Sequence, residues 1–292
     1  MASTSDLHVA KLFSVKDYVC VVTGGGSGIG LMASQALAAN GAKVYITGRR
    51  VEALEQVAKS HNPSGGGQII PLGPCDVTSK QDLEQLYIEL SSREKYINLL
   101  ICAAGISGTK AEPSEEKATD LKSKLWSAET FESWGETYNT DVSAVYFSTV
   151  VMLPLLQAGS ETHGHLSASV IVISSMSGIM RHAQGHFSYN AAKGATVHLA
   201  KLMSGEFQKL HIRVNSIAPG YFPSEMTTDE SDENQKSYVP DEKIQEKGHV
   251  PMGRAGSDAE MAMAVMFLAK NAYVNGEVLA VDGGVLNVVG GR

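Results

Sequence analysis

Short apolar runs that alternate with longer helical patterns constrain the fold of this chain more than any other feature. The runs are nearly continuous in Val, Ile and Leu, which is typical of strands buried on both faces of a parallel sheet. We expect strands at residues 18–23, 43–47, 68–72, 97–105, 169–175, 212–220 and 276–284. With helices between them, they predict an α/β fold: a doubly wound, single parallel sheet of about seven strands, covered on both faces.

The segments between these runs define the rest of the domain. We expect helices from the first glycine turn to about residue 40, near 51–60 and 79–94, at 131–157, around Tyr189 and Lys193, and at 257–270. A chain of 292 residues that is 43% apolar fits one such domain at 15–292, after an N-terminal extension at 1–14. Of two polar stretches, 107–130 is either a solvated insertion or a border of the substrate site, and 225–250 is expected to be a lid.

A glycine-rich turn, "TGGGSGIG" at 23–30, joins the first expected strand to the first expected helix. Gly24, Gly28 and Gly30 permit a tight turn and a close approach of the backbone to a pyrophosphate, while the helix N-terminus offers free N–H groups to phosphate. Because a strand precedes the turn and an apolar helix follows it, the motif predicts a dinucleotide site of the Rossmann type rather than a merely structural turn.

The end of the second expected strand indicates which dinucleotide binds. NAD enzymes place an acidic residue there for the ribose 2′-hydroxyl, but this chain reads "TGRR". Arg49 and Arg50 match a 2′-phosphate, although two surface arginines at a helix start are the simpler alternative. We therefore expect NADP(H) in preference to NAD(H). Asp76, after the third strand, is expected to reach the adenine ring or to cap the next helix.

A serine, a tyrosine and a lysine follow the fifth expected strand. Ser175 is placed at its end, and Tyr189 and Lys193 lie four residues apart on one face of the next helix. Reduction of a carbonyl by hydride requires a proton donor, and a phenol serves better when a nearby cation stabilises its phenolate. Ser175 can hold the substrate oxygen. The pattern predicts proton transfer by Tyr189, not simple packing.

These motifs, with "CDVTS", "ICAAG", "ISSMSG", "RVNSIAPG" and "NGEVLAVDGG", make the chain resemble the short-chain dehydrogenase/reductase family over about residues 15–286. The resemblance implies that Tyr189 donates the proton, Lys193 lowers its pKa and Ser175 orients the carbonyl. "APGYFPSEMT" is most similar to fungal and bacterial 3-oxoacyl (rhamnolipid-type) reductases. The cofactor residues implied by motif and resemblance are Gly24, Ser27, Gly28, Ile29, Gly30, Arg49, Arg50, Asp76, Val77, Ala103, Gly105, Tyr189, Lys193, Pro219, Gly220, Phe222 and Ser224.

Two positions depart from the family pattern. Cys102 and Ala103 replace two asparagines that usually follow the fourth strand. The family's fourth catalytic residue is an asparagine seven positions after a tryptophan, and counting from Trp134 gives Asp141. A carboxylate there favours a protonated Lys193 but opposes a phenolate at Tyr189. We expect either a working but shifted proton relay through Asp141 or a member that has lost ordinary turnover.

The remaining composition limits the partners. A net charge of −7 without a long basic run argues against nucleic acid. Three cysteines (Cys20, Cys75 and Cys102) and scattered histidines lack metal-ligand spacing, so we expect reduced core thiols and no metal. There is no apolar leader, and no apolar run is expected to approach the roughly 20 residues that cross a bilayer, so a cytoplasmic protein without membrane contact is predicted.

The substrate side is predicted less sharply. Residues expected to line it are mostly apolar or aromatic, which suits a ketone on a greasy or polyketide-like body: Ile106, Met180, His186, Tyr221 and Phe222. His186 is either a second acid or a wall residue. The leading hypothesis is an NADPH-dependent reductase, against an NAD-dependent secondary alcohol dehydrogenase or a redox-inactive cofactor-binding scaffold. The resemblance also implies a homotetramer or homodimer.

Overall fold

The computed structural model describes residues 3–163, 168–228 and 230–289. Its centre is one sheet of seven parallel strands in the order β3-β2-β1-β4-β5-β6-β7, which confirms the predicted fold class. The order reverses between β1 and β4, and ligands of such sheets bind at the carboxyl ends beside this reversal. The strands are β1 (Val19–Thr23), β2 (Lys43–Thr47), β3 (Gln68–Pro71), β4 (Leu99–Cys102), β5 (Ser169–Ile173), β6 (Arg213–Pro219) and β7 (Val278–Val281).

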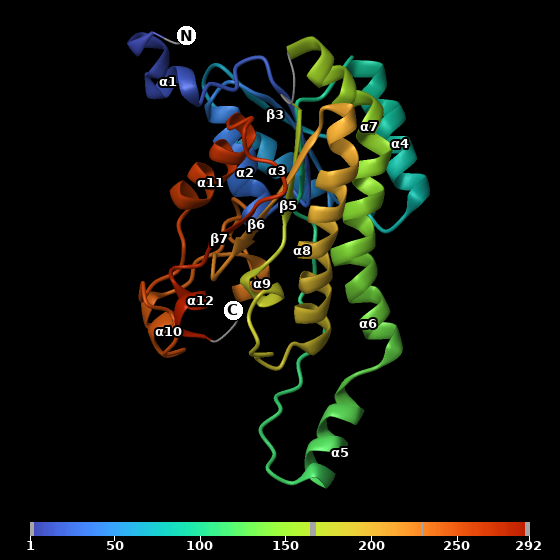
Figure 1. Cartoon of the computed structure of the whole chain (residues 1–292), viewed down its shortest axis with the longest axis vertical. Coiled ribbons are helices and arrows are strands. Elements are labelled where there is room, and N and C mark those ends of the chain that lie inside the picture. Colours follow the sequence, from blue (N-terminus) through green and yellow to red (C-terminus); the bar gives the residue numbers. More distant parts are fainter. Residues whose placement is uncertain (1–2, 164–167, 229, 290–292) are drawn as a thin grey trace.

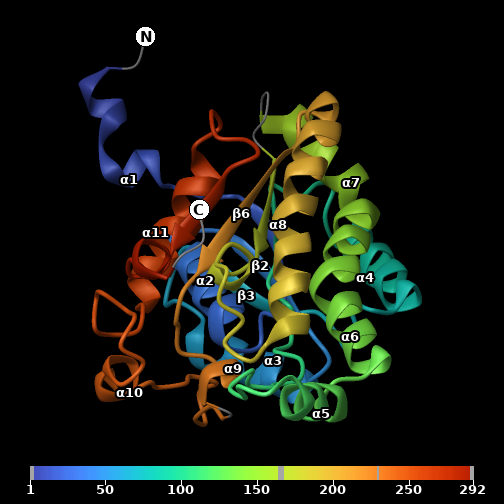
Figure 2. The same ribbon diagram turned by 60° about the horizontal axis from the view of Figure 1, so that its bottom comes forward.

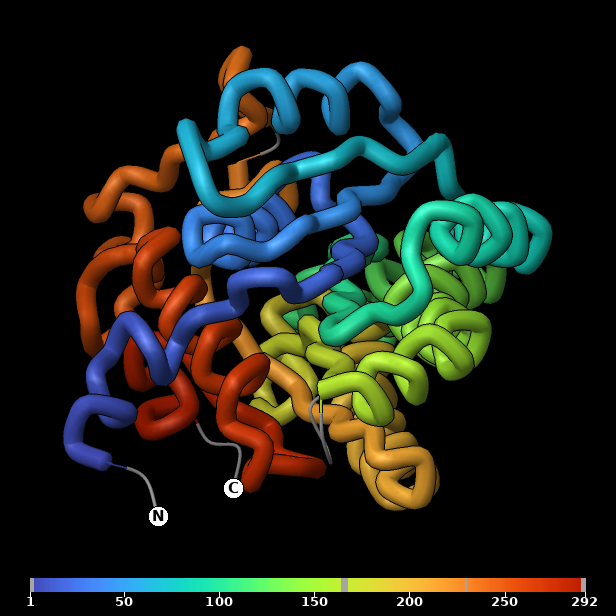
Figure 3. The backbone as a smooth tube through the Cα atoms, turned by 90° about the horizontal axis from the view of Figure 1, so that it is seen from above, coloured from blue at the N-terminus to red at the C-terminus, as the bar shows by residue number. Residues whose placement is uncertain are grey.

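Helices cover both faces of the sheet (Figures 1 and 3). One apolar core lies between the sheet and α2, α3 and α11, and a second lies between the sheet and α4, α7 and α8. Residues of β1 to β6 contribute to both cores, whereas β7 contributes only to the first. The covering helices are α2 (Gly28–Ala39), α3 (Val51–His61), α4 (Lys80–Arg93), α6 (Phe131–Tyr138), α7 (Ala144–His163), α8 (Phe187–Phe207) and α11 (Asp258–Lys270).

The long helix predicted at 131–157 extends to His163 and contains one π-helical turn, η2 (Asn139–Ser143), between α6 and α7. A π turn adds a residue to the local repeat and commonly occurs at functional sites. By length and composition alone, the run Phe131–His163 is apolar enough to cross a membrane, with a window of mean hydropathy 1.5. The expectation that no run approaches this length is therefore wrong, although half of the window is buried inside the protein and α7 packs on α4 and β4.

Several apolar runs continue past the strands that they form. The run 97–105 gives only β4, so Ala103 to Gly105 form a loop at the carboxyl edge. Likewise β5 ends at Ile173, and Ser175 instead precedes a short 3-10 helix, η3 (Met176–Gly178). In each case the backbone leaves the sheet just before residues that are expected to lie at the site.

Shorter elements lie outside the repeat. The extension holds η1 (Thr4–Leu7) and α1 (Val9–Leu12), and η4 (Gln208–Leu210) follows α8. The 107–130 stretch forms α5 (Ala118–Ala128), a helix with no buried residue that projects from the body (Figure 1). The 225–250 segment holds α9 (Glu225–Thr228) and α10 (Asp241–Gln245), and α12 (Val285–Val288) follows β7. Figure 2 brings the end with α5, α9 and α10 forward.

Candidate active site

A large cavity of about 1110 Å³ opens at the carboxyl ends of the strands. That volume slightly exceeds the usual range for one drug-sized ligand, so it leaves room for a dinucleotide beside a substrate. Every residue that we expected to bind the cofactor lines this cavity, as does Ser175. Asp141 and Met180 do not belong to its lining. The glycine turn, the two arginines and the reactive tyrosine thus surround one continuous space.

The glycine turn packs so tightly against neighbouring backbone that two of its positions have no room for a side chain. A Cβ atom at Gly30 would lie 2.2 Å from the carbonyl oxygen of Gly24, and one at Gly24 would lie 2.7 Å from the backbone nitrogen of Ala104. Gly24 also has a φ of +67°, which favours glycine. Ser27 precedes α2 without capping it through its side chain, so the first N–H groups of α2 remain for an anion in the cavity. These features fit a pyrophosphate.

The two arginines after β2 point to different partners. Arg49 lies near Asp76 and contributes to the lowered pKa of that carboxyl, whose main cause is hydrogen bonding from Thr78. Arg50 instead forms an ion pair with Glu225, at the start of the expected lid. The cap predicted for Asp76 is wrong, because Ser79 caps α4 by accepting from the backbone N–H of Asp82. Asp76 Oδ1 accepts from Thr78, and the residue lines the cavity.

The three residues expected to take part in proton transfer are brought together by η3 and the first turns of α8. Ser175 is the N-cap of η3, where its Oγ accepts from the backbone N–H of Ser177 at 3.1 Å. Gly178 allows η3 to lie against α8, since a Cβ there would be 2.4 Å from the backbone of Lys193. Tyr189 sits in the first turn of α8, and Lys193 Nζ lies 5.6 Å from its ring centroid. The structure therefore brings Ser175, Tyr189 and Lys193 together at the cavity.

Lys193 is held firmly behind the tyrosine. Its side chain is almost fully buried, and its Nζ donates to the carbonyl oxygen of Ile173 at 3.2 Å. Burial alone would lower the pKa of Lys193, but the nearby Asp141 carboxylate and Tyr189 outweigh it and raise that pKa. The ammonium is therefore charged at neutral pH.

Asp141 lies in the π turn, behind Lys193 rather than in the cavity. It is fully buried; its Oδ2 is 3.5 Å from Lys193 Nζ, and its Oδ1 accepts from the backbone N–H of Ile106 at 2.9 Å. Burial raises the pKa of Asp141, while Lys193 and the Ile106 bond lower it in part. Gly105 makes room for this contact, since a Cβ there would lie 3.1 Å from Oδ1. Asp141 can thus act on Tyr189 only through Lys193 and through its charge.

The pKa of Tyr189 reflects these opposing neighbours. Burial raises it, Lys193 and the Ser175 hydroxyl lower it, Asp141 raises it again, and the net shift is upward. The family resemblance implied that Lys193 lowers this pKa, and that contribution exists, but in this chain it does not prevail. The phenol therefore stays protonated at neutral pH, which suits a proton donor more than a base.

On the substrate side, the expected residue Tyr221 contacts two polar residues that the sequence did not indicate, Gln184 and His249. Gln184 Nε2 donates to Tyr221 Oη at 2.9 Å, and Tyr221 Oη lies 3.0 Å from Nε2 of His249, within the expected lid. Gln184 and Tyr221 both line the cavity, but Met180 packs instead with Met176 and Val285. Residue spacing alone could not indicate these contacts, because Gln184, Tyr221 and His249 come from three separate segments of the chain.

His186 lies beside Tyr189, with 6.5 Å between the ring centroids. Burial, followed by the charge of Lys110, lowers the pKa of His186, so the imidazole is neutral at neutral pH. This favours a wall residue over a second charged acid. The three cysteines are buried and unpaired, and the described part of the chain holds no cluster of three or more metal-ligating side chains.

Comparison with known proteins agrees with this architecture. The family model described as "Enoyl-(Acyl carrier protein) reductase" matches residues 24–286. The short-chain dehydrogenase/reductase PhomF of Diaporthe leptostromiformis is 40% identical over 291 residues, covering 98% of this chain and 97% of PhomF. The rhamnolipids biosynthesis 3-oxoacyl-[acyl-carrier-protein] reductase of Pseudomonas aeruginosa is 31% identical, covering 93% of this chain and 97% of that enzyme.

A solved structure shows the same fold. The Pseudomonas aeruginosa RhlG/NADP active-site complex aligns with a TM-score of 0.78 and 29% identity, covering 94% of this chain and 98% of RhlG. Seven parallel strands, the glycine turn and near-complete coverage by these relatives all lead to one assignment. The chain is an oxidoreductase that belongs to the short-chain dehydrogenase/reductase family.

Proposed function

We propose that this protein is an NADPH-dependent reductase that delivers hydride to the ketone of a 3-oxoacyl or polyketide-like substrate, with Tyr189 as the proton donor. The observation that carries the proposal is the convergence of Ser175, Tyr189 and a charged, buried Lys193 at one end of the cavity that the glycine turn enters.

Each of the three residues has a distinct task. The bound cofactor supplies the hydride. Ser175 holds the carbonyl oxygen of the substrate through its hydroxyl, and Tyr189 gives its proton to that oxygen as negative charge develops there. Lys193 stabilises the resulting phenolate, because its Nζ remains charged near the tyrosine ring. The raised pKa of Tyr189 keeps the phenol protonated near neutral pH, which is the form that reduction of a carbonyl requires.

NADP(H) is the proposed cofactor because two arginines and no acidic residue directly follow β2. Both line the cavity, and a guanidinium pairs well with a phosphate. The neighbour RhlG was solved with NADP, which supports the same choice.

The substrate class rests on the character of the cavity and on relatives. Ile106, Met176 and Met226 line it beside the polar pair Gln184 and Tyr221, so a largely apolar ketone with a polar substituent fits. One relative is named for a 3-oxoacyl-[acyl-carrier-protein] substrate. We therefore favour 3-oxoacyl thioesters and polyketide-like ketones over small diketones.

The experiment follows NADPH oxidation by the purified protein against 3-oxoacyl thioesters, aromatic polyketide-like ketones and simple diketones, with Tyr189→Phe and Tyr138→Phe compared. Loss of a general acid typically lowers the rate about 10²–10⁴-fold, so we expect a loss of that size for Tyr189→Phe. Tyr138, exposed on α6 and outside the cavity lining, serves as the matched control. Equal turnover in Tyr189→Phe and the wild type would refute the proposal.

Other outcomes would point to the alternatives. Faster turnover with NAD and a secondary alcohol would indicate a dehydrogenase. Tight NADPH binding without turnover, restored by Asp141→Asn, would indicate a member whose redox activity was lost through the buried carboxylate. A cytoplasmic location and a homodimer or homotetramer remain predictions, the latter testable by light scattering.

A further inference from the structure

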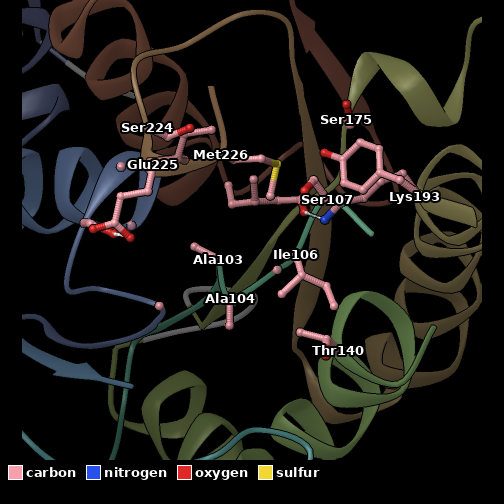
Figure 4. Close-up of a pocket in the computed structure, with 18 of the residues that line it drawn as sticks. Ala103, Ala104, Ile106, Ser107, Thr140, Ser175, Lys193, Ser224, Glu225 and Met226 are labelled. Atoms are coloured by element: carbon pink, nitrogen blue, oxygen red, sulfur yellow. Dashed lines mark hydrogen bonds between the residues drawn. The ribbon is translucent and has the colours of Figure 1, made fainter. Parts of the chain in front are cut away.

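An ion pair bridges the cofactor end of the cavity. Arg50, after β2, donates from Nη2 to Oε2 of Glu225 at 2.7 Å and from Nη1 to Oε1 at 3.0 Å. Both residues line the cavity although 175 positions separate them. Figure 4 places Glu225 and Ser224 at the opposite end from Ser175 and Lys193. The pair thus lies at the end remote from proton transfer.

Glu225 is fixed in this position by further bonds. Ser231 Oγ donates to Oε1 at 3.0 Å, and Ser27 Oγ, at the start of α2, donates to Oε2 at 3.4 Å. Burial would raise the pKa of Glu225, but the hydrogen bonds from Arg50, Ser231 and Ser27 outweigh it and hold that pKa below its ordinary value. The carboxylate is therefore charged at neutral pH and occupies both terminal nitrogens of the Arg50 guanidinium.

This arrangement has a consequence for the phosphate of a cofactor. A 2′-phosphate is bound after the second strand of this fold, where Arg50 lies. The Arg50 guanidinium, which would pair with the phosphate, already pairs with the carboxylate of Glu225. Since a carboxylate and a phosphate dianion repel each other at one guanidinium, binding of the phosphate requires Glu225 to leave. A cofactor with a 2′-hydroxyl needs no such exchange, because a carboxylate accepts a hydrogen bond from it.

We propose that Glu225 sets the cofactor selectivity of this enzyme by competing with the 2′-phosphate of NADP(H) for Arg50. The inference builds on the proposed function, in which NADP(H) binds beside Arg49 and Arg50. Arg49 lies near Asp76 and is not part of the Arg50–Glu225 ion pair, so a second guanidinium lines the cavity for the phosphate. Glu225 therefore reduces the preference for NADPH without abolishing it.

The test is a double-mutant cycle on cofactor affinity. The dissociation constants of NADPH and NADH are measured by fluorescence titration for the wild type, Glu225→Gln, Arg50→Met and the double variant. The pair is partly exposed, so we expect Glu225→Gln to tighten NADPH binding about three- to fivefold and to leave NADH unchanged or slightly weaker. In the Arg50→Met background the same substitution is expected to have no effect on the ratio of the two constants.

Glu89→Gln is the matched control, because Glu89 pairs with Arg93 on the surface of α4 and neither residue lines the cavity. Melting curves of all variants check that the fold is intact, and Glu225→Ala gives a second comparison if the glutamine variant is unstable. An unchanged NADPH to NADH ratio in Glu225→Gln overturns the proposal. If Glu225→Gln changes the NADPH to NADH ratio equally in the wild type and in the Arg50→Met variant, Glu225 does not act by competing for Arg50.

The same titrations test the proposed preference for NADPH independently of the role of Glu225. If the wild type binds NADH more tightly than NADPH, the NADP assignment is wrong. In that case, competition by Glu225 for Arg50 is still supported if Glu225→Gln shifts the ratio of the two dissociation constants toward NADPH. It is refuted if this ratio does not change.

Discussion

Nζ of Lys193 lies 3.5 Å from Oδ2 of Asp141, a carboxylate with no exposure to solvent. Asp141 is not part of the cavity lining, whereas Lys193 and Tyr189 are, so Lys193 is shared between Asp141 and Tyr189. Asp141 raises the pKa of Lys193 and also raises that of Tyr189. We expect Asp141 to act as a positioning residue whose charge adjusts Tyr189, the proposed proton donor.

Replacing Asp141 with asparagine is therefore expected to lower the pKa of Tyr189. An amide keeps an oxygen for the backbone N–H of Ile106 but removes the charge that opposes the phenolate. Alcohol oxidation needs the phenolate and rises with pH, whereas ketone reduction needs the phenol and falls with pH. In Asp141→Asn, we expect both the rise of the oxidation rate and the fall of the reduction rate to occur at lower pH. Measurement of kcat against pH in each direction would show this.

Asp120→Asn controls for the loss of one negative charge, since Asp120 is exposed on α5. It is expected to leave both profiles in place. Superimposable profiles for Asp141→Asn and the wild type would show that the buried charge has no influence on the tyrosine.

The sequence predicted the sheet and the cavity lining well because both depend on local signals. Continuous apolar runs indicate buried parallel strands, and polar or glycine residues after them meet at one edge. Ser175 shows the limit of this reasoning, since the apolar run hides the point at which β5 ends and η3 begins.

Long-range contacts and exposed elements could not be predicted from local sequence patterns. Glu225 meets Arg50 across 175 residues, and no local pattern links them. The helix α5 buries none of its residues and lies in the polar stretch 107–130, for which no helix was predicted. Counting from Trp134 identified Asp141, but only the structure shows that it lies behind Lys193.

Gly178→Ala is expected to impair turnover by separating η3 from α8. The added Cβ would lie 2.4 Å from the backbone of Lys193, so η3, which begins at Ser175, must move. Overpacking of this kind costs about 1–3 kcal/mol of stability. A displacement of a reacting group by about 1 Å can lower the rate about 10²-fold, which steady-state kinetics would measure.

Gly205→Ala, on the same helix, is the matched control. It has no atom within 4 Å of the added Cβ, so it is expected to stabilise α8 by about 0.5–1 kcal/mol and to leave kcat unchanged. If both substitutions leave kcat unchanged, the close contact between η3 and α8 does not position Ser175.

Glu260→Gln is expected to destabilise the fold near neutral pH but not in acid. Hydrogen bonds from Arg254, and then from the backbone and side chain of Ser257, lower the pKa of Glu260 to about 2. A carboxyl whose pKa is lower in the folded chain stabilises that state above its unfolded pKa, and the contribution is lost as the pH falls toward the folded value. Because the pair with Arg254 is partly exposed, we expect about 1 kcal/mol, comparable with a helix cap.

Urea unfolding at pH 7, 5, 4 and 3 would measure this loss. The difference in the free energy of unfolding between the wild type and Glu260→Gln is expected to be full at pH 7 and to shrink steadily below about pH 4.5, since the unfolded wild type takes up a proton on this carboxyl there while the folded chain still holds it ionised. Glu84→Gln, an exposed change on α4, controls for the general effect of removing an acid. A difference that stays constant down to pH 3 would show that Glu260 stabilises α11 through packing, since a contribution from its charge must titrate.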